Sequence, residues 1–350
     1  MKKIAIGLSG GVDSASAAYL LLEKGYDVTG IILRLKPESL ADGDISDAQK
    51  IADRLGIELR VVDRRDFFKE NVIDPFVSEY KNARTPNPCV ECNSVIKFGA
   101  MLDYALQIGC DGIATGHYAR IEENGGRFLL KKSESPKDQS YFLYKLSQHQ
   151  LSHTVFPLEG LEKTEIREIA EKAGLPVAEK GDSQEICFVP DDDYISYLAS
   201  LGITSPKGNF VDINGNILGT HNGIINYTIG QRKGLGAFGK PMFVTGISAE
   251  NNTVTIGENG SQYSSGLIAD RLNFIPFDKL DVPMRADVKI RFRAKPAPAT
   301  VTPNNDGTVS VVFDEPQRSV TPGQSAVFYD GDTVIGGGRI ISAFTQKQFQ

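Results

Sequence analysis

The sequence has few cysteines and no long apolar run. Four cysteines in 350 residues are too few for a disulfide scaffold, so we expect thiols that pack in the core, bind a metal or take part in catalysis. No run reaches the 18 apolar residues that a membrane helix needs, and the apolar stretch after Lys2 and Lys3 is too short for a signal peptide. The sequence therefore predicts a cytoplasmic protein with no membrane-spanning segment.

A general excess of positive charge is also missing. The formal net charge of −6 argues against a protein that coats nucleic acid, but it leaves room for a local basic track. A chain of 350 residues is longer than a domain with a single hydrophobic core usually is, and this one contains neither internal repeats nor low-complexity segments. We expect a globular protein of two or three domains.

The first 120 residues alternate between short strand-like runs and amphipathic helical runs. Runs rich in Val and Ile predict buried strands, and a glycine just past an amphipathic run marks the end of a helix. Strands are predicted at 3–8, 26–33, 57–63 and 111–116, and helices at 14–24, 45–55, 65–80, 94–108 and 164–173. This alternation predicts an α/β fold with a doubly wound parallel sheet, which binds ligands beyond the carboxyl ends of its strands.

The rest of the chain is predicted to be rich in β-structure. Asn124-Gly125-Gly126 marks a hairpin, and from about residue 206 short β-like runs are separated by turns such as Asn214-Gly215 and Asp306-Gly307. The segment 268–276 is interpreted as a seam between two β units, of which the second is a small barrel or sandwich.

The stretch GLSGGVDS, residues 7–14, lies between the first strand and the first helix and allows two interpretations. As a G-x-S-x-G nucleophile elbow it would make Ser9 the catalyst of a hydrolase. As a glycine-rich turn it would bind phosphates with the backbone N–H groups of a helix start. None of the four histidines has an acidic partner at a recognisable spacing, and no Gly-Lys-Ser/Thr of a Walker loop follows. Phosphate binding is therefore favoured, and SGGVDS resembles the loop of the PP-loop ATP pyrophosphatases, which adenylate a substrate oxygen.

Three of the cysteines are candidates for chemistry. Cys89 and Cys92 follow the segment RTPNP, whose prolines predict a loop leading into helix 94–108, where a thiolate is favoured. Cys187 is distant in sequence, and Cys110 is expected to be an ordinary buried thiol. Cys89-x2-Cys92 is half of a zinc site without a second half. The open alternatives are a metal or iron–sulfur cluster on three cysteines, and sulfur transfer in which one thiol carries a persulfide and another resolves it.

A closer resemblance covers nearly the whole chain. The motifs RTPNP-x3-CN-x3-KF, GHYAR, KDQSYFL, GDSQEICF, YTIGQRKGLG, KIRFRA and VTPGQSAVFY are similar, in this order, to those of the tRNA-specific 2-thiouridylases, the MnmA/TrmU family. The resemblance implies three domains: a PP-loop ATP pyrophosphatase domain at 1–200, a small central β domain at 201–267 and a C-terminal β-barrel at 268–350. It implies a sulfurtransferase that thiolates the wobble uridine of lysine, glutamate and glutamine tRNAs at position 2.

The same resemblance implies the roles of individual residues. Cys92 matches the family's nucleophile and Cys187 its persulfide carrier, and the two end the reaction as a disulfide. ATP with Mg²⁺ is expected to be bound by Gly7, Leu8, Ser9, Gly10, Gly11, Val12, Asp13, Ser14, Leu33 and Gly116. The target base and other parts of tRNA are expected to contact Asn87, Pro88, Cys89, His117, Lys137, Asp138, Gln139, Arg291, Phe292 and Gln324. Partners are tRNA and a sulfur donor, either a cysteine desulfurase or a sulfur-relay protein, and we expect a monomer.

The chain departs from the family pattern at two of these positions. Cys89 stands where many members have aspartate, and a thiol has a pKa near 8.5 rather than about 4, so it does not inherit an acid–base role directly. With Cys89 in place of aspartate, the chain has three thiols for one site, Cys89, Cys92 and Cys187. This favours a 4Fe-4S cluster more strongly here than in members that have the aspartate. Leu33 stands where many members have methionine. Asp182 and Ser183 precede Cys187 and are expected to position its loop.

The segment VKIRFRAK, residues 288–295, predicts a strand with a cationic stripe. Lys289, Arg291, Arg293 and Lys295 would point to one side over about 20 Å, at 3.3 Å per residue. A stripe of that length suits a nucleic-acid backbone, although an ordinary solvated strand face has the same pattern. Phe292, if it turned outward, would stack on a base.

Other classes of function remain open at this point. A serine hydrolase would use Ser9 without ATP, and a sulfur carrier or RNA-binding module would bind tRNA without releasing pyrophosphate. Another PP-loop enzyme would adenylate a different substrate. The separated cysteines and the basic segments of the β domains argue against this last alternative.

Overall fold

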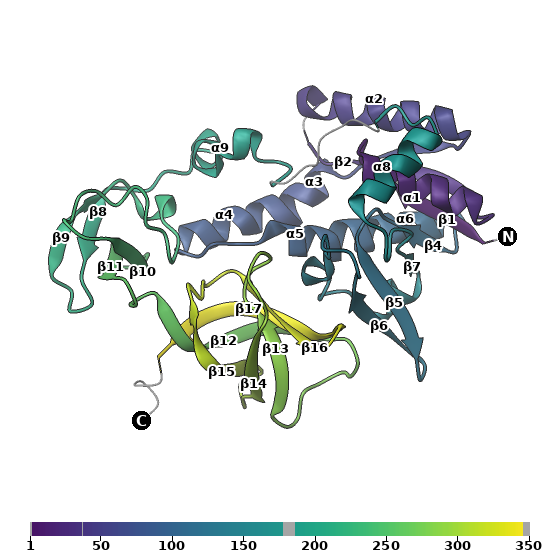
Figure 1. The fold of residues 1–350 in the computed structure, drawn as a ribbon. Coiled ribbons are helices and arrows are strands. Elements are labelled where there is room, and N and C mark those ends of the chain that lie inside the picture. The colour runs from purple at the N-terminus through teal and green to yellow at the C-terminus, as the bar shows by residue number, and fades with distance from the viewer. Residues whose placement is uncertain (1, 37, 178–185, 346–350) are drawn as a thin grey trace.

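A five-stranded parallel sheet organises the N-terminal part of the chain in the computed structural model, which describes residues 2–36, 38–177 and 186–345 (Figure 1). The strands lie in the order β3-β2-β1-β4-β7, and all neighbouring pairs are parallel. The chain thus builds outward from β1 in both directions, as in a doubly wound sheet, with the switch point between β1 and β4. The strands are β1 (Lys3–Gly7), β2 (Asp27–Arg34), β3 (Leu59–Asp63), β4 (Gly112–Ala114) and β7 (Thr154–Val155).

Helices cover both faces of this sheet because alternate residues of a buried strand point to opposite sides. Ile4 and Ile6 of β1 belong to one core, which they share with α1 (Val12–Glu23), α2 (Glu38–Leu55) and α8 (Lys163–Lys172). Ala5, between them, belongs to the core on the other face, shared with α6 (Met101–Gln107). The predicted α/β fold and its four predicted strands are confirmed.

The helix that carries two of the cysteines begins earlier than predicted. A continuous helical stretch consists of α5 (Pro88–Glu91), the π-helical η2 (Cys92–Ala100) and α6. The expectation of a loop up to residue 94 was wrong, because Pro88 occupies the first helical turn, where a missing N–H breaks no hydrogen bond. Cys89 and Cys92 consequently lie in the first two turns of a helix.

A second helical stretch passes through a proline. It comprises α3 (Arg65–Phe68), the π-helical η1 (Lys69–Ile73) and α4 (Asp74–Lys81), and Pro75 stands in the first turn of α4. The wider π turn immediately before Pro75 accommodates the lost hydrogen bond and the ring. In Figure 1 this stretch runs above the barrel toward the central domain. The remaining short helices are η3 (Ser140–Phe142), α7 (Gln148–Ser152), η4 (Pro190–Asp192), α9 (Tyr194–Ser200) and η5 (Ile224–Asn226).

Two β units follow the parallel sheet, as predicted. The central sheet has the order β10-β11-β8-β9 and consists of β8 (Gly208–Val211), β9 (Ile217–His221), β10 (Met242–Ser248) and β11 (Thr253–Glu258). The last unit is a closed barrel, because β12 pairs with both β15 and β17. Its strands are β12 (Tyr263–Phe274), β13 (Met284–Lys289), β14 (Ala297–Pro303), β15 (Val309–Arg318), β16 (Ser325–Asp330) and β17 (Thr333–Phe344). The expected start of a third domain at residue 268 lies inside β12.

The predicted hairpin at Asn124 is formed by β5 (Ala119–Asn124) and β6 (Arg127–Lys132). It joins the sheet of the barrel, because Lys131 of β6 pairs with Thr333 of β17, and Figure 1 shows it alongside the barrel. Two strands of the N-terminal domain, β5 and β6, therefore extend the sheet of the C-terminal barrel. Among the described residues, no helix combines the length and apolar character needed to cross a membrane.

Arg339 also ties the barrel to the N-terminal domain. Its guanidinium donates to Glu79 of α4 at 2.7 Å and to both carboxylate oxygens of Asp270 at 2.6 and 3.0 Å. These side chains are only 15–27% exposed, so removing the cation leaves the poorly solvated Asp270 carboxylate without this partner and leaves Glu79 with the longer pair to Arg84 at 3.5 Å. We expect Arg339→Leu to lower the free energy of unfolding by about 3 kcal/mol, measured by urea denaturation.

A matched control is Arg285→Leu, which breaks the exposed pair with Asp314 (58% and 51% exposed). Exposed pairs contribute at most about 1 kcal/mol, so this variant should unfold close to the wild type. Equal destabilisation by the two variants would contradict a special role for Arg339.

Candidate active site

The glycine-rich stretch forms a turn between β1 and α1, at the carboxyl end of β1. Leu8 N–H donates to Ile31 of β2 at 2.8 Å, which keeps the chain in the sheet up to the turn. Gly10 has φ +71°, a conformation that favours glycine. Gly11 is the N-cap of α1 and has no side chain to cap the helix, so the first N–H groups of α1 remain available to an anion.

Ser9 and Ser14 face each other across this turn. Their hydroxyls lie 3.2 Å apart, and the Ser14 hydroxyl donates to Gly11 O at 3.0 Å. In the described part of the chain the contact of the Ser9 hydroxyl is thus Ser14 and not a histidine. This arrangement supports an anion-binding turn and gives Ser9 no general base of the kind that a hydrolase needs.

Asp13, in the first turn of α1, is held by two residues that the sequence patterns did not single out. Its Oδ1 accepts hydrogen bonds from the Tyr118 hydroxyl and from Lys163 Nζ, both at 2.7 Å. Lys163 opens α8, so the ion pair joins the starts of two helices beside the phosphate turn. A cation at this position also adds positive potential to the helix N-terminus.

Gly116 closes the site from the other side of the switch point. It follows β4, and a Cβ built on it would lie 2.8 Å from the backbone carbon of Asp13 and from the backbone nitrogen of Ser14. Only a glycine therefore allows this loop to touch the start of α1. Leu33, near the end of β2, is half-buried and contacts the core clusters, so the predicted ATP residues gather at the carboxyl edge of the sheet, where doubly wound folds bind ligands.

Although Cys187 is far away in sequence, its neighbours Ile186 and Phe188 pack in the same core cluster as Cys92. Cys92 is buried (8% exposed), Cys89 is half-buried and Cys187 is exposed. Burial raises the pKa of the Cys92 thiol to about 12, and the nearby Cys187 and Cys89 add to this, whereas the charge of Lys97 lowers it. The pKa of Cys89 is raised mainly by burial, and the same Lys97 opposes the shift. At neutral pH both groups are therefore protonated thiols, and Cys92 must lose its proton before it attacks.

The thiols do not form a metal site in the described residues. Across residues 2–36, 38–177 and 186–345, no group of three or more His, Cys, Asp or Glu side chains is arranged to hold a metal ion. The iron–sulfur cluster considered for Cys89, Cys92 and Cys187 stays a prediction. Asp182 and Ser183, expected to position Cys187, lie outside the described residues.

His117 lies between the carboxyl end of the sheet and the helical stretch of α5, η2 and α6, called here the cysteine helix. It follows Gly116, its Nδ1 lies 2.8 Å from the Thr115 hydroxyl, and its ring packs between Phe98 and Phe156. Burial and the charge of Lys97 hold the pKa of His117 well below its usual value, so the ring is neutral. Its contact with tRNA stays a prediction, and it would require the ring to be uncovered.

The segment Lys137–Gln139 lies beside the same loop. The Asp138 carboxylate accepts hydrogen bonds from the backbone of Ser133 and Ser140, at 3.0 and 3.2 Å. Gln139 pairs with the backbone of Tyr118 in both directions, at 2.8 and 3.1 Å, while the side chain of Lys137 is exposed. Asp138 and Gln139 therefore fold the loop, and Lys137 is the member that faces solvent.

The predicted cationic strand at 288–295 was wrong. β13 ends at Lys289, and Ala294 N–H donates to Arg291 O at 3.1 Å in a turn. Arg291 points inward and donates to Ile229 O at 3.0 Å and to the Thr321 hydroxyl. Phe292 packs on Phe142, with ring centroids 4.5 Å apart. An alternating pattern does not distinguish a strand from a strand that ends in a turn, because tertiary contacts decide which way each side chain faces.

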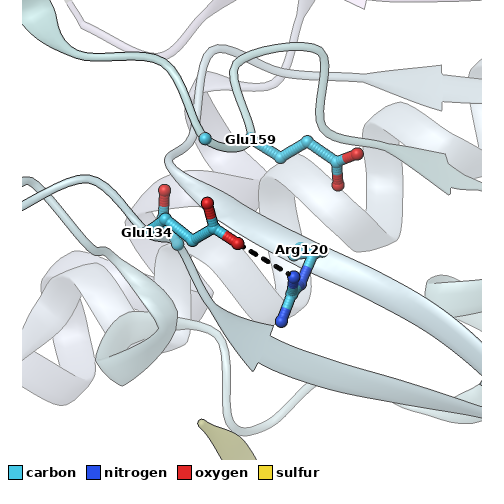
Figure 2. Close-up of a pocket in the computed structure, with 5 residues that line it drawn as sticks. Arg120, Glu134 and Glu159 are labelled. Atoms are coloured by element: carbon cyan, nitrogen blue, oxygen red, sulfur yellow. Dashed lines mark hydrogen bonds and ion pairs between the residues drawn. The ribbon is translucent and has the colours of Figure 1, made fainter.

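One surface hollow near the hairpin can be set aside as a phosphate site. It is lined by Arg120, Ser133, Glu134, Glu159 and Gly160 (Figure 2). Its cation, Arg120, already pairs with Glu134 at 3.4 Å and with Asp332 at 2.5 Å. The carboxylates around this guanidinium oppose an incoming anion.

Two further side chains near the cysteine helix were not predicted. Lys97 lies in η2, in the KF of the motif that contains Cys92, and its charge reaches both thiols and His117. Lys145 pairs with Glu91 of α5 at 2.5 Å and anchors the turn between Cys89 and Cys92. Lys97 could have been found from the sequence, because it follows Cys92 on the same helix. No local sequence pattern indicated Lys145.

A glycine-rich turn at the switch point of a doubly wound sheet, in a domain that also carries a thiol-bearing helix, places this domain in the PP-loop class of ATP-using enzymes. Family models match the chain in three consecutive parts: the tRNA methyl transferase HUP domain over residues 2–191, the tRNA methyl transferase PRC-barrel domain over 196–258 and the aminomethyltransferase beta-barrel domain over 264–340.

Relatives named tRNA-specific 2-thiouridylase MnmA match almost from end to end. The protein of Clostridioides difficile is 50% identical over 353 residues, covering 97% of this chain and 98% of the relative. That of Clostridium acetobutylicum is 51% identical over 352 residues, covering 97% and 99%. That of Acetivibrio thermocellus is 51% identical over 355 residues, with the same coverage. The chain belongs to the tRNA-specific 2-thiouridylase family.

Proposed function

We propose that this protein is a sulfurtransferase that uses ATP to replace O2 of the wobble uridine of lysine, glutamate and glutamine tRNAs by sulfur. The observation that supports the proposal is that the segment around Cys187 packs in the same core cluster as Cys92, in a domain whose first turn is suited to phosphates. A domain for adenylation alone has no need of two such thiols. Family membership supports tRNA as the substrate.

Adenylation makes the oxygen a leaving group. Uridine O2 attacks the α-phosphorus of ATP, the bond to the bridging oxygen breaks, and pyrophosphate leaves from the turn at residues 7–14. The free N–H groups at the start of α1 and the Ser9 hydroxyl stabilise the charge on the phosphates. Mg²⁺ accepts oxygen ligands, and the Asp13 carboxylate is such a donor at the turn, so bound Mg²⁺ would neutralise phosphate charge there.

Sulfur then replaces the adenylated oxygen. Cys187 carries the sulfur as a persulfide, and Cys92 attacks the Cys187 sulfur, so that the S–S bond breaks and hydrosulfide leaves as a Cys92–Cys187 disulfide forms. Hydrosulfide adds to C2 and AMP leaves with the oxygen. In the direct variant, the terminal persulfide sulfur adds to C2 first and Cys92 breaks the S–S bond afterwards. A thiol reductant must reduce the disulfide before the next turnover.

The proposal includes the partners that the chemistry requires. A cysteine desulfurase or a sulfur-relay protein would load the exposed Cys187 in the cytoplasm, where thiols stay reduced, and the enzyme would act as a monomer. The residues expected to contact the target base, Asn87, Pro88 and Cys89, stand at the start of the cysteine helix. The uridine must leave the anticodon stack to reach them.

The proposal is tested by reconstitution with purified protein, ATP, Mg²⁺, tRNA transcripts and a persulfide donor. We expect thiolated lysine, glutamate and glutamine tRNAs, detected by retardation in a mercury-containing gel, and no retardation when ATP is omitted. Cys187→Ser should abolish the reaction with the persulfide donor. Normal retardation with Cys187→Ser, or in the absence of ATP, would contradict the mechanism, and labelling of Ser9 by a fluorophosphonate would instead support a hydrolase.

A further inference from the structure

A turn of the C-terminal barrel, Thr321–Gln324, packs against the segment that leads into the cysteine helix. Thr85 N–H donates to Pro322 O at 2.9 Å. The side-chain amide of Gln324 donates to Thr85 O at 2.9 Å and to Pro86 O at 3.3 Å. Backbone groups on both sides of Thr85 are thus satisfied by the barrel and not by their own domain.

The approach of the two backbones is too close for a side chain. Gly323, in the middle of the turn, has φ +94°, and a Cβ on it would lie 2.8–2.9 Å from three backbone atoms of Thr85. Glycine therefore meets two requirements here, the left-handed conformation and the close contact. The conformation of the turn therefore allows close backbone contact with the segment around Thr85.

The central domain joins at the same point. The Thr85 hydroxyl donates to the Thr228 hydroxyl at 3.1 Å. Arg291 of the barrel donates to Ile229 O of the central domain at 3.0 Å, and it also contacts Thr321 of the turn. All three domains consequently meet around Thr85, four residues before Cys89.

We propose that the Thr321–Gln324 turn, with Gln324 as its main contact, is a positioning element that fixes the start of the cysteine helix. This inference rests on the proposed sulfur transfer. Asn87, the N-cap of α5, makes no side-chain capping hydrogen bond, so the entry of the helix depends on contacts made just before it, at Thr85 and Pro86. A misplacement of about 1 Å at reacting atoms costs on the order of 100-fold in rate.

Gln324 and Arg291 then act on the chemistry through Cys92 and not through a direct bond to tRNA. Gln324 Nε2 and Arg291 Nη2 already donate to backbone carbonyls inside the protein, which is the work of positioning residues. RNA that docks on the barrel near the turn would be sensed at Cys92 through the same contacts.

The test compares Gln324→Ala with Gln317→Ala, which removes an amide bonded to the Glu315 carbonyl elsewhere in the barrel. We expect Gln324→Ala to speed alkylation of Cys92 by iodoacetamide in tRNA-free protein about two- to tenfold. This is the increase in local opening that the loss of one buried hydrogen bond produces. The single-turnover thiolation rate should fall about ten- to 100-fold, with the tRNA Kd within twofold of wild type. Gln317→Ala should change none of these.

Gln324→Asn, which keeps the amide but shortens its reach, provides a second variant if Gln324→Ala does not fold, and the same changes are expected. Weaker tRNA binding in proportion to the lost activity, with Cys92 alkylation unchanged, would overturn the proposal and make Gln324 a tRNA contact. Alkylation is read without tRNA, ATP or sulfur, so a protein that fails to thiolate tRNA still tests the positioning role.

Discussion

Cys92→Ser is expected to abolish sulfur transfer and to leave adenylation of tRNA intact. A serine hydroxyl cannot form the disulfide with Cys187 by which sulfur is released, so the thiolation rate should fall by about 10³-fold or more. Pyrophosphate release depends on the turn at residues 7–14, which does not use the thiol. The two activities are measured on the same preparation, by mercury-gel retardation and by tRNA-dependent pyrophosphate release.

Cys110→Ala is the control for removal of a buried thiol. Cys110 is 5% exposed and packs in the core behind the sheet, away from Cys187. Its loss should cost stability through a small cavity but leave both activities near those of the wild type. Thiolation by Cys92→Ser above one-tenth of the wild-type rate, or loss of pyrophosphate release together with thiolation, would contradict the division of labour between the turn and the thiols.

Gly116→Ala is expected to weaken ATP binding strongly. The added methyl group would overlap the backbone between Asp13 and Ser14, and backbone cannot rotate away as a side chain can. The start of α1 must then move, and overpacking of this kind costs about 1–3 kcal/mol. Because this helix start is the proposed phosphate site, the Kd for ATP should rise about ten- to 100-fold, measured by isothermal titration calorimetry.

Gly43→Ala is the matched control for this substitution. Gly43 lies in α2, and a Cβ there meets nothing within 4 Å, so alanine should favour the helix slightly and leave ATP binding unchanged. Wild-type affinity in Gly116→Ala would refute the assignment of this loop to the nucleotide site. A loss of affinity in both variants would point to a general effect on the fold.

Local sequence patterns predicted the parallel sheet and the turn after β1. Ile4, Ala5 and Ile6 alternate between two cores, and strands of this kind are recognisable because both faces are buried within a few residues. The left-handed Gly10 and the uncapped start of α1 are equally local. The prediction of a loop up to residue 94 was wrong because of Pro88. A proline can interrupt a helix or stand in its first turn, and the neighbouring residues do not distinguish the two cases.

By itself, then, the sequence determined the doubly wound sheet, the glycine-rich turn after β1 and the β-rich C-terminal half, because periodicity and glycine conformation act over a few residues. Only the tertiary structure decided that the segment around Cys187 packs in the same core as Cys92, that β6 pairs with β17, and that Arg291 turns inward. These contacts join residues far apart in the chain, and their free energy comes from burial and hydrogen bonds that exist only once the domains have packed together.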